Sequence, residues 1–245
     1  IDRVLIKNIS GSGYCLATVY VGENIKIMNC IFDGGLHGFM GGCTGNMLYK
    51  GNIAMNQVND GHKFGALRRS HVINNWAINV GKNGFTFENS DCEYSEIAEN
   101  IAYNPTVITG GRAFRCESSV GYYLTFRNNW AINFDRAFHD EVQGTEYPHH
   151  RFIGNVVIGG NIGFYLQADW AYIYGHYFNG NHIVNCGAGI YITRNSLDEI
   201  IINNVFQNVT TPLSLNLNQP AIVKNNYGYV TENSGTATIP ANTKS

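Results

Sequence analysis

Short apolar runs followed by asparagine recur along most of the chain. Residues 73–79 read INNWAIN, residues 100–104 read NIAYN and residues 128–133 read NNWAIN. Runs rich in Val, Ile, Phe and Tyr that are bounded by Asn or Gly are typical of short β-strands. Because no long helical pattern separates these runs, we predict an all-β chain with many short strands.

The asparagines follow one another at a nearly constant interval of 21 to 29 residues. The tracked positions are Asn8, Asn29, Asn52, Asn75, Asn100, Asn129, Asn155, Asn181, Asn204 and Asn226. A leucine-rich repeat would need its leucine signature and a helical segment, and a propeller blade would need a period of about 40 to 50 residues. The interval therefore predicts a parallel β-helix of about ten coils.

Asparagine has two properties that suit such a coil. It tolerates the left-handed backbone conformation that a tight turn requires. Its amide both donates and accepts hydrogen bonds, so Asn side chains of successive coils can bond along the axis. We predict both roles for the tracked residues. Small residues two positions later indicate a narrow interior; they are Ala54, Ala77, Ala102 and Ala131.

The coil period and the row of asparagines resemble those of the right-handed parallel β-helix superfamily. This superfamily includes pectate lyases, other polysaccharide lyases, family 28-type pectin hydrolases and phage tailspikes. The resemblance covers about residues 4–230 and implies a single-stranded right-handed parallel β-helix over residues 1–230. It also implies a protein located outside the cell or on a cell or virion surface. The NTD, DD and GHG set of the pectin hydrolases is not found, which favours a lyase over a hydrolase.

Residues 231–245 change in character from the rest of the chain. They are mostly small and polar. We expect a C-terminal linker or the start of a further domain there.

Composition limits the kind of partner. The 245 residues are 44% hydrophobic but only 14% charged, and the net charge is −2. A nucleic-acid partner would need a basic stripe, and a membrane span would need a run of about 18 apolar residues. The sequence contains neither. Its six cysteines, an even number without a CxxC pair, are compatible both with buried thiols and with disulfides.

Most repeats also contain a small residue that is followed by a large apolar one, as at Gly84 and Ala113, and we call this small residue the anchor. Aligning the strands that contain the anchors gives the candidate site residues. Side chains alternate between the two faces of a strand, so positions two and four past the anchor should point outward and position three inward. The first outward row is Met40, Lys63, Thr86, Arg115, His139, Tyr165 and Tyr191, and the second includes Glu88, Glu117, Glu141 and Gln167. Asp140 falls in the inward row, either through a slip in the alignment or as a buried carboxylate with a partner.

The second outward row places three carboxylates on consecutive coils. Adjacent strands lie about 4.8 Å apart, so Glu88, Glu117 and Glu141 repel one another unless a cation intervenes. Ca²⁺ prefers several carboxylate oxygens, and we predict these three residues as its ligands. Surface ion pairs with Lys63 and Arg115 are the alternative, each contributing ~0–1 kcal/mol.

The same residues suit β-elimination on a uronate polymer. That reaction needs the substrate carboxylate neutralised, a base for the proton at C5 and an acid for the leaving oxygen. We predict Lys63, Arg115, His139 and Tyr165 as the catalytic residues. Two of the carboxylates could instead be the acid and base of a glycoside hydrolase.

The longest repeats flank these residues. Their extra segments lie at residues 106–112 and 142–150, and added loop length beside a regular solenoid usually forms the walls of a site. The predicted substrate-binding residues are Arg112, Tyr147, Gln167, Trp170 and Tyr191. His149 and His150 are expected at a loop edge.

We therefore predict an extracellular polysaccharide lyase that acts on an acidic, uronate-containing glycan. A non-catalytic solenoid is the main alternative, such as a glycan-binding protein, an adhesin, a tailspike-like fibre or a structural spacer. A tailspike-like protein would be a homotrimer, whereas the enzyme is expected to be a monomer. Mixed charge on the coils with the longest insertions favours the enzyme, because a spacer needs no such cluster.

Overall fold

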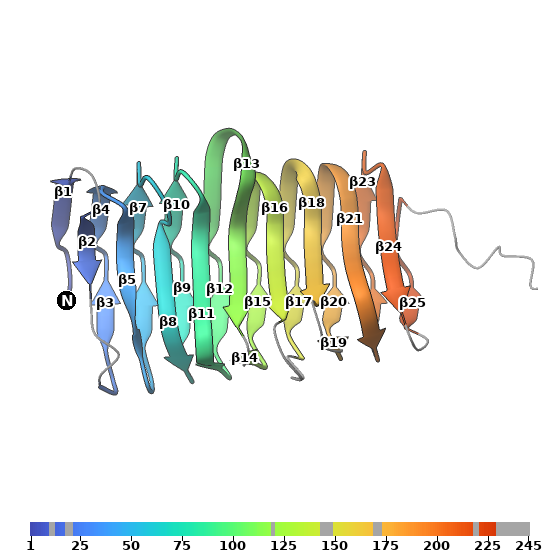
Figure 1. Cartoon of the computed structure of the whole chain (residues 1–245), viewed down its shortest axis with the longest axis horizontal. Helices are drawn as coiled ribbons and strands as arrows, with labels where there is room; N and C mark the ends of the chain where they lie inside the picture. The colour runs from blue at the N-terminus through green and yellow to red at the C-terminus, as the bar shows by residue number, and fades with distance from the viewer. Residues whose placement is uncertain are drawn as a thin grey trace, which may run out of the picture.

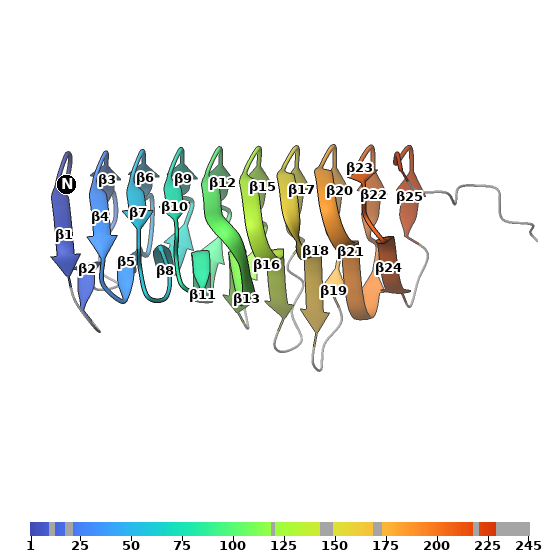
Figure 2. The same cartoon turned by 90° about the horizontal axis from the view of Figure 1, so that it is seen from above.

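The chain forms an elongated parallel β-solenoid in the computed structural model (Figure 1). The structure describes residues 1–9, 13–17, 22–118, 121–142, 149–168, 173–217 and 221–228, and it contains strands and no helix within these ranges. The predicted all-β parallel solenoid is confirmed, with a number of coils slightly below the ten predicted. Successive coils lie side by side along the long axis (Figure 2).

The first face of the solenoid is a nine-stranded parallel sheet of three-residue strands. Its strands are β3 (Lys26–Met28), β6 (Leu48–Lys50), β9 (His71–Ile73), β12 (Glu96–Ala98), β15 (Thr125–Arg127), β17 (Arg151–Ile153), β20 (Tyr177–Asn179), β22 (Ile200–Ile202) and β25 (Ile222–Lys224). In most of these strands the central residue is buried and its two neighbours are more exposed, as strand alternation requires.

A sixteen-stranded sheet supplies the other two faces. The second face contains β1 (Leu5–Ile9), β4 (Ile31–Gly34), β7 (Ile53–Met55), β10 (Trp76–Ile78) and β23 (Val205–Gln207). The third face contains β2 (Tyr14–Ala17), β5 (His37–Cys43), β8 (His62–Arg68), β11 (Asn83–Glu93) and β24 (Thr211–Leu217). Four long strands run through both faces: β13 (Ile101–Ser118), β16 (Trp130–Val142), β18 (Val156–Ala168) and β21 (His182–Leu197). The short β14 (Gly121–Tyr122) pairs with β11, and β19 (Ile173–Tyr174) pairs with β21.

The turn between the first and second faces carries the asparagine ladder, which we define as Asn52, Asn75, Asn100, Asn129, Asn155, Asn181, Asn204 and Asn226. In each step, the Oδ1 atom of one Asn accepts from both the backbone N–H and the side-chain amide of the Asn one coil earlier, at 2.9–3.1 Å. Asn52 to Asn204 are fully buried. The predicted bonding of asparagines along the axis is confirmed for these residues.

Two details of the ladder differ from the prediction. The left-handed residue is not the ladder Asn but the residue before it, as at Asn74 (φ 56°) and Asn128 (φ 54°). Asn29 is such a turn residue, and the ladder position on its coil is held by Cys30, whose backbone N–H donates to Asn52 Oδ1 at 3.0 Å. The left-handed residue therefore makes the turn, and the ladder Asn after it accepts the hydrogen bond of the buried backbone N–H. A single residue conformation cannot serve both purposes.

The interior is narrow and filled with stacked side chains. Ala54, Ala77, Ala102 and Ala131 are neighbours in register and are buried, as predicted. Phenylalanine rings stack from coil to coil, for example Phe114 on Phe138 with centroids 4.8 Å apart. All six cysteines are buried and free, so the thiol alternative is confirmed over disulfides. Because the interior is continuous, each coil is stabilised by its packing against the neighbouring coils.

Candidate functional site

The predicted first outward row exists as one continuous line of register partners across the third face. Met40 pairs with Lys63, Lys63 with Thr86 and Thr86 with Arg115. The line continues through Arg115 with His139, His139 with Tyr165 and Tyr165 with Tyr191. In the second row, Glu88, Glu117, Glu141 and Gln167 are successive partners. Counting from the small anchor residues thus located both rows correctly.

The three glutamates are tied to basic side chains of the first row. Lys63 Nζ lies 3.0 Å from Glu88 Oε1. The guanidinium of Arg115 bridges two coils, at 2.6 Å from Glu117 Oε2 and 3.0 Å from Glu141 Oε2. Within these ion pairs, two cations offset two of the three negative charges. The predicted Ca²⁺ site stays a prediction.

The residues of this network influence one another's charge. Burial lowers the pKa of Lys63, but the hydrogen bond and charge of Glu88 outweigh burial and raise it overall. Burial raises the pKa of Glu117, and the carboxylates of Glu88 and Glu141 act in the same direction against the lowering effect of Arg115. Lys63 therefore stays protonated and is a poor base, while Glu117 takes up a proton more readily than an ordinary glutamate.

A second cluster overlaps this network on β13 and β16; we call it the arginine cluster, and it contains Arg112, Arg136, His139 and Tyr165. Arg112 Nε donates to His139 Nδ1 at 2.8 Å. The Arg136 guanidinium lies over the Tyr165 ring, 4.3 Å from its centroid, which is a cation–π distance. The Tyr165 ring also contacts the rings of His139 at 4.9 Å and Tyr191 at 5.5 Å.

Arg112 and Arg136 are register partners on β13 and β16. Neither forms an ion pair with a carboxylate within the part of the chain that the structure describes. Burial lowers the pKa of Arg112, and the nearby charges of Arg115 and Arg136 lower it further. The carboxylates of Glu141 and Glu117 act in the opposite direction. Two guanidinium groups without an ion-pair partner on adjacent strands repel each other and attract an anion.

His139 is 2% exposed. Burial, together with Arg112 and Arg136, lowers its pKa to about 3. Since Nδ1 accepts from Arg112, the proton of the neutral ring is on Nε2, which is buried and has no partner among the described residues. His139 is thus a buried, neutral ring and not a strong base.

The predicted catalytic residues share one row, in which Arg115 is the register partner of His139 and His139 contacts Tyr165, but Lys63 lies apart from them. Lys63 and Tyr165 are four strand steps apart, about 19 Å at the spacing of a sheet. Lys63 and Arg115 belong to the glutamate network, whereas His139 and Tyr165 belong to the arginine cluster. Of the predicted substrate-binding residues, Arg112 and Tyr191 adjoin that cluster, and Gln167 follows Glu141 in the second row. Tyr147 and Trp170 lie outside the described residues.

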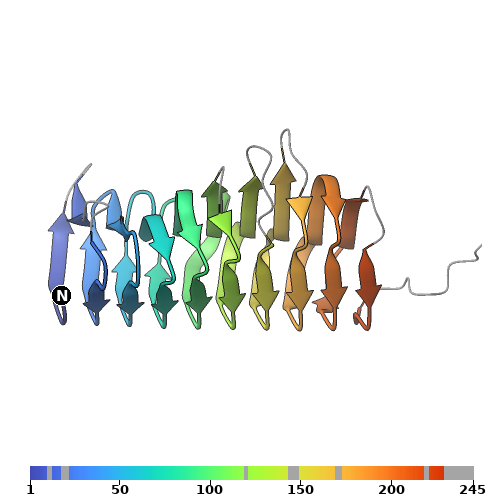
Figure 3. The ribbon, with the colours of Figure 1, turned by 90° about the horizontal axis from the view of Figure 1, so that it is seen from below.

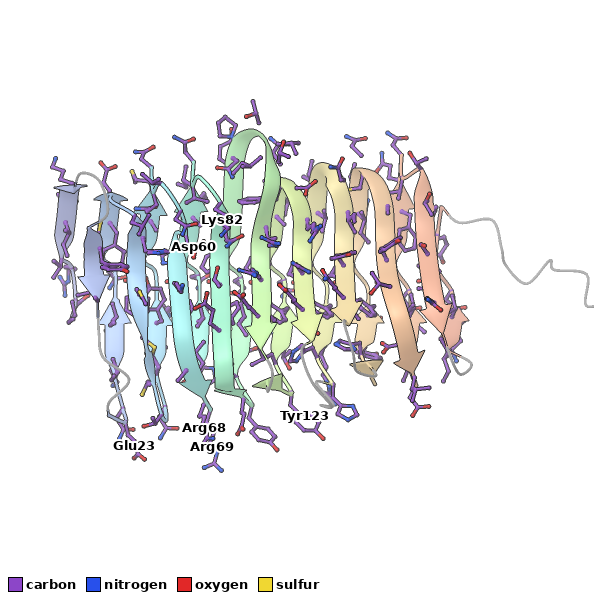
Figure 4. All side chains as sticks on the ribbon, viewed as in Figure 1. Glu23, Asp60, Arg68, Arg69, Lys82 and Tyr123 are labelled. Carbon is purple, nitrogen blue, oxygen red and sulfur yellow. The ribbon has the colours of Figure 1, made fainter. Side chains whose placement is uncertain are left out.

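The sequence reasoning missed Arg136. It stands one position before the anchor Ala137, as Arg112 stands before Ala113, and these positions form a third outward row. The same row contains Asp60, whose carboxylate accepts from Asn83 Nδ2 at 2.7 Å and lies 3.4 Å from His37 Nδ1. Figure 4 shows Asp60 on the third face near Lys82. Counting backwards from the anchor as well as forwards would have found this row.

Asp140 is the buried carboxylate with a partner, as one of the two readings proposed. It is 3% exposed, and its Oδ2 accepts from His176 Nε2 at 2.9 Å. His176 Nδ1 in turn lies 3.4 Å from Glu199 Oε1. Burial lowers the pKa of His176, but Glu199 and Asp140 outweigh it and raise that pKa to about 9. His150 is also buried, with Nε2 3.8 Å from Asp140 Oδ2, and it lies directly before β17, at the loop edge expected for it.

The Asp140 cluster also brings three potential metal ligands together. Cys116, Asp140 and His150 are the only set in the described residues with ligand atoms within 4.8 Å of one another. His150 Nδ1 accepts from the backbone N–H of Leu124 at 3.2 Å, so the ring proton is on Nε2, the nitrogen that faces Asp140. A protonated nitrogen cannot ligate a metal, and the cluster is better described as a buried charge network.

No family model, no curated protein and no solved structure matches this chain. Within the described residues there is also no helix of the length and apolar character needed to cross a membrane. A function for this chain must therefore be argued from the geometry of the third face and from the resemblance in coil period.

Proposed function

We propose that this protein is an extracellular polysaccharide lyase that binds an acidic, uronate-containing glycan along its third face. The observation that carries the proposal is the pair of guanidinium groups, Arg112 and Arg136, that lack carboxylate partners beside His139 and Tyr165. The resemblance of the coil period to that of the pectate lyase-like proteins supports the same substrate class.

The arginine cluster suits the first requirement of β-elimination. A uronate carboxylate bound between Arg112 and Arg136 would have its charge neutralised, and His139 Nδ1 would hold the Arg112 guanidinium in place. Neutralising this carboxylate makes the proton at C5 more acidic, because the negative charge that develops on removing it is stabilised by the same groups.

Tyr165 is the group best placed to move the proton. In its phenolate form, with the Arg136 guanidinium over the ring, it can take the proton from C5. The electrons then form the C4–C5 double bond, the C4–O bond breaks, and Tyr165 returns the proton to the leaving oxygen. Lys63, Arg115 and the three glutamates would line neighbouring sugar positions along the row.

Ultraviolet absorbance of unsaturated uronate ends tests the proposal on pectate, alginate, glycosaminoglycans and a neutral glycan. We expect product from one acidic polymer, a loss of at least 100-fold in Arg136→Gln and Tyr165→Phe, and little change in Lys26→Gln on the first face. Adding Ca²⁺ or a chelator tests the glutamates as metal ligands.

Two outcomes would overturn the lyase proposal. Binding of an acidic polymer without unsaturated or reducing ends would leave a non-catalytic glycan-binding solenoid. Full activity in Arg136→Gln would remove the arginine pair from the reaction.

A further inference from the structure

The corner between the third and first faces contains one left-handed residue per coil. This corner row is Asn24, Asn46, Arg69, Tyr94, Tyr123, His149, Gly175 and Asp198, with φ between 47° and 62°. Asn, Asp and Gly adopt this conformation at low cost, whereas a bulky side chain there is strained. Three consecutive coils nevertheless carry aromatic rings at this position, which marks the segment as a candidate for function.

The three rings form an exposed stack, which we call the aromatic ladder: Tyr94, Tyr123 and His149. Neighbouring ring centroids are 5.2 and 5.3 Å apart, with planes inclined by 11° and 9°. Tyr94 is 58% and Tyr123 46% exposed. Figure 4 shows the Tyr123 and Arg69 side chains projecting from the lower edge of the solenoid, and Figure 3 views this edge from below. The ladder ends at Gly175, where a Cβ would collide with the His149 ring.

Two adjoining clefts run along the aromatic ladder. One, of about 340 Å³, is lined by His71, Tyr94, Ser95, Glu96, Tyr123, Thr125 and Arg151. The other, of about 420 Å³, is lined by Tyr123, His149, Arg151, Gly175, Tyr177 and Ile200. Because Tyr123 and Arg151 line both, the clefts form one groove parallel to the axis.

The opposite wall of the groove is the outward row of the first face. His71, Glu96, Thr125, Arg151, Tyr177 and Ile200 are register partners in that order. The carboxylate of Glu96 is engaged by Arg127 at 2.7 Å and by His71 at 3.3 Å. Arg151 is exposed and forms no ion pair with any described residue. The groove therefore offers one uncompensated positive charge at its centre.

We propose that this groove is a second glycan-binding site, separate from the third face, that takes an extended acidic sugar chain. Tyrosine rings and hydroxyls provide the mixture of apolar contact and hydrogen bonding that sugar rings require. The rings recur once per coil, at 5.2 and 5.3 Å. This spacing suits an extended chain whose sugar units have a similar length. Arg151 would bind a carboxylate of that chain, which favours an acidic ligand over a neutral one.

The inference goes beyond the proposed function, because it needs no reaction and none of the residues of the third face. Its test uses an oligogalacturonate and the methyl-esterified, uncharged form of the same oligomer. Binding is measured by calorimetry in an Arg112→Gln/Arg136→Gln background, which removes the third-face site. The two proposals can thus fail separately.

Tyr123→Asn is the decisive variant, because Asn occupies the same corner position at residues 24 and 46. We expect at least a tenfold loss of affinity for the charged oligomer together with an unchanged or raised Tm, since strain is relieved. Arg151→Gln should lose a similar factor, and the esterified oligomer should bind correspondingly weakly to the unmodified groove. The matched control is Arg69→Asn, one coil before Tyr94, which should keep its affinity.

The opposite pattern would overturn the inference. If Tyr123→Asn lowers Tm and leaves affinity unchanged, the aromatic ladder only packs the coils together. If the charged oligomer fails to bind in the double-arginine background, the groove is not a site for this ligand.

Discussion

At the scale of single residues, the most unusual feature is a charged histidine inside the solenoid. His176 is fully buried between Asp140 and Glu199, and its pKa is raised to about 9. Burial raises the pKa of Asp140, but His150 and the hydrogen bond from His176 lower it overall. Each charge is retained because the other is present, since an isolated buried charge would be neutralised.

This network should make the folded state less stable at alkaline pH. The pKa of His176 is higher in the folded state than the value of 6.5 expected when it is unfolded. Its contribution is therefore fully present below pH 6.5 and is lost as pH rises through about 9. We expect Tm to fall across this window in the wild type and to change less in His176→Gln. The exposed His71→Gln should keep the wild-type slope, and equal slopes in all three proteins would contradict the prediction.

At the scale of structural elements, the asparagine ladder is the main polar support of the coils. Asn129 Oδ1 accepts from the backbone and amide of Asn100, and its own amide donates to Ile97 O and to Asn155 Oδ1. Removing this side chain leaves several buried groups without partners, and each costs roughly 1–3 kcal/mol. The ladder thus explains why a long, narrow solenoid can bury so many polar atoms.

We expect Asn129→Ala to reduce the free energy of unfolding by about 3 kcal/mol or more, measured by urea denaturation. The adjacent turn residue Asn128 (φ 54°) provides the control. Asn128→Gly should change stability by no more than about 0.5 kcal/mol, because Gly adopts the left-handed conformation freely. Similar losses in both variants would show that the ladder has no special role.

The small anchor residues permit the close approach of neighbouring coils. A Cβ at Gly84 would lie 2.7 Å from both Ala102 Cβ and Ala113 O. Gly84→Ala should therefore destabilise the protein by about 1–3 kcal/mol through overpacking. At Gly45 the nearest atom to an added Cβ is 3.5 Å away, so Gly45→Ala should be neutral or slightly stabilising. Thermal unfolding of the two variants compares them directly, and equal Tm values would refute the packing argument.

At the scale of the whole molecule, the solenoid is held together without covalent links between coils. All six cysteines are free and buried, and burial raises the pKa of Cys116 and Cys186. We expect slow reaction of the native protein with a thiol reagent and six reactive thiols in denaturant, with or without prior reduction. A count of four or fewer without reduction would demonstrate a disulfide.

The architecture could be predicted because it is repeated in the sequence. The interval between asparagines sets the length of a coil, and the anchors set the register of the third face, so Arg115, His139 and Tyr165 were aligned correctly. The exact ladder position on the coil of Asn29 could not be predicted, because adjacent asparagines differ only in backbone conformation. The ion pairs and hydrogen bonds within each row could not be predicted either. The register places side chains next to one another but does not specify which of them bond.

The sequence by itself determined the fold class, the phase of the ladder and the rows of outward residues, because each follows from periodicity along the chain. Only the tertiary structure decided that Arg112 bonds His139, that Arg136 covers Tyr165 and that His176 reaches Asp140, 36 residues away. It also joined Lys63 and Arg115 to the three glutamates and revealed the groove beside Tyr123. The physical reason is that the pairing, burial and charge of these side chains depend on packing between coils, where residues distant in sequence compete for the same partners.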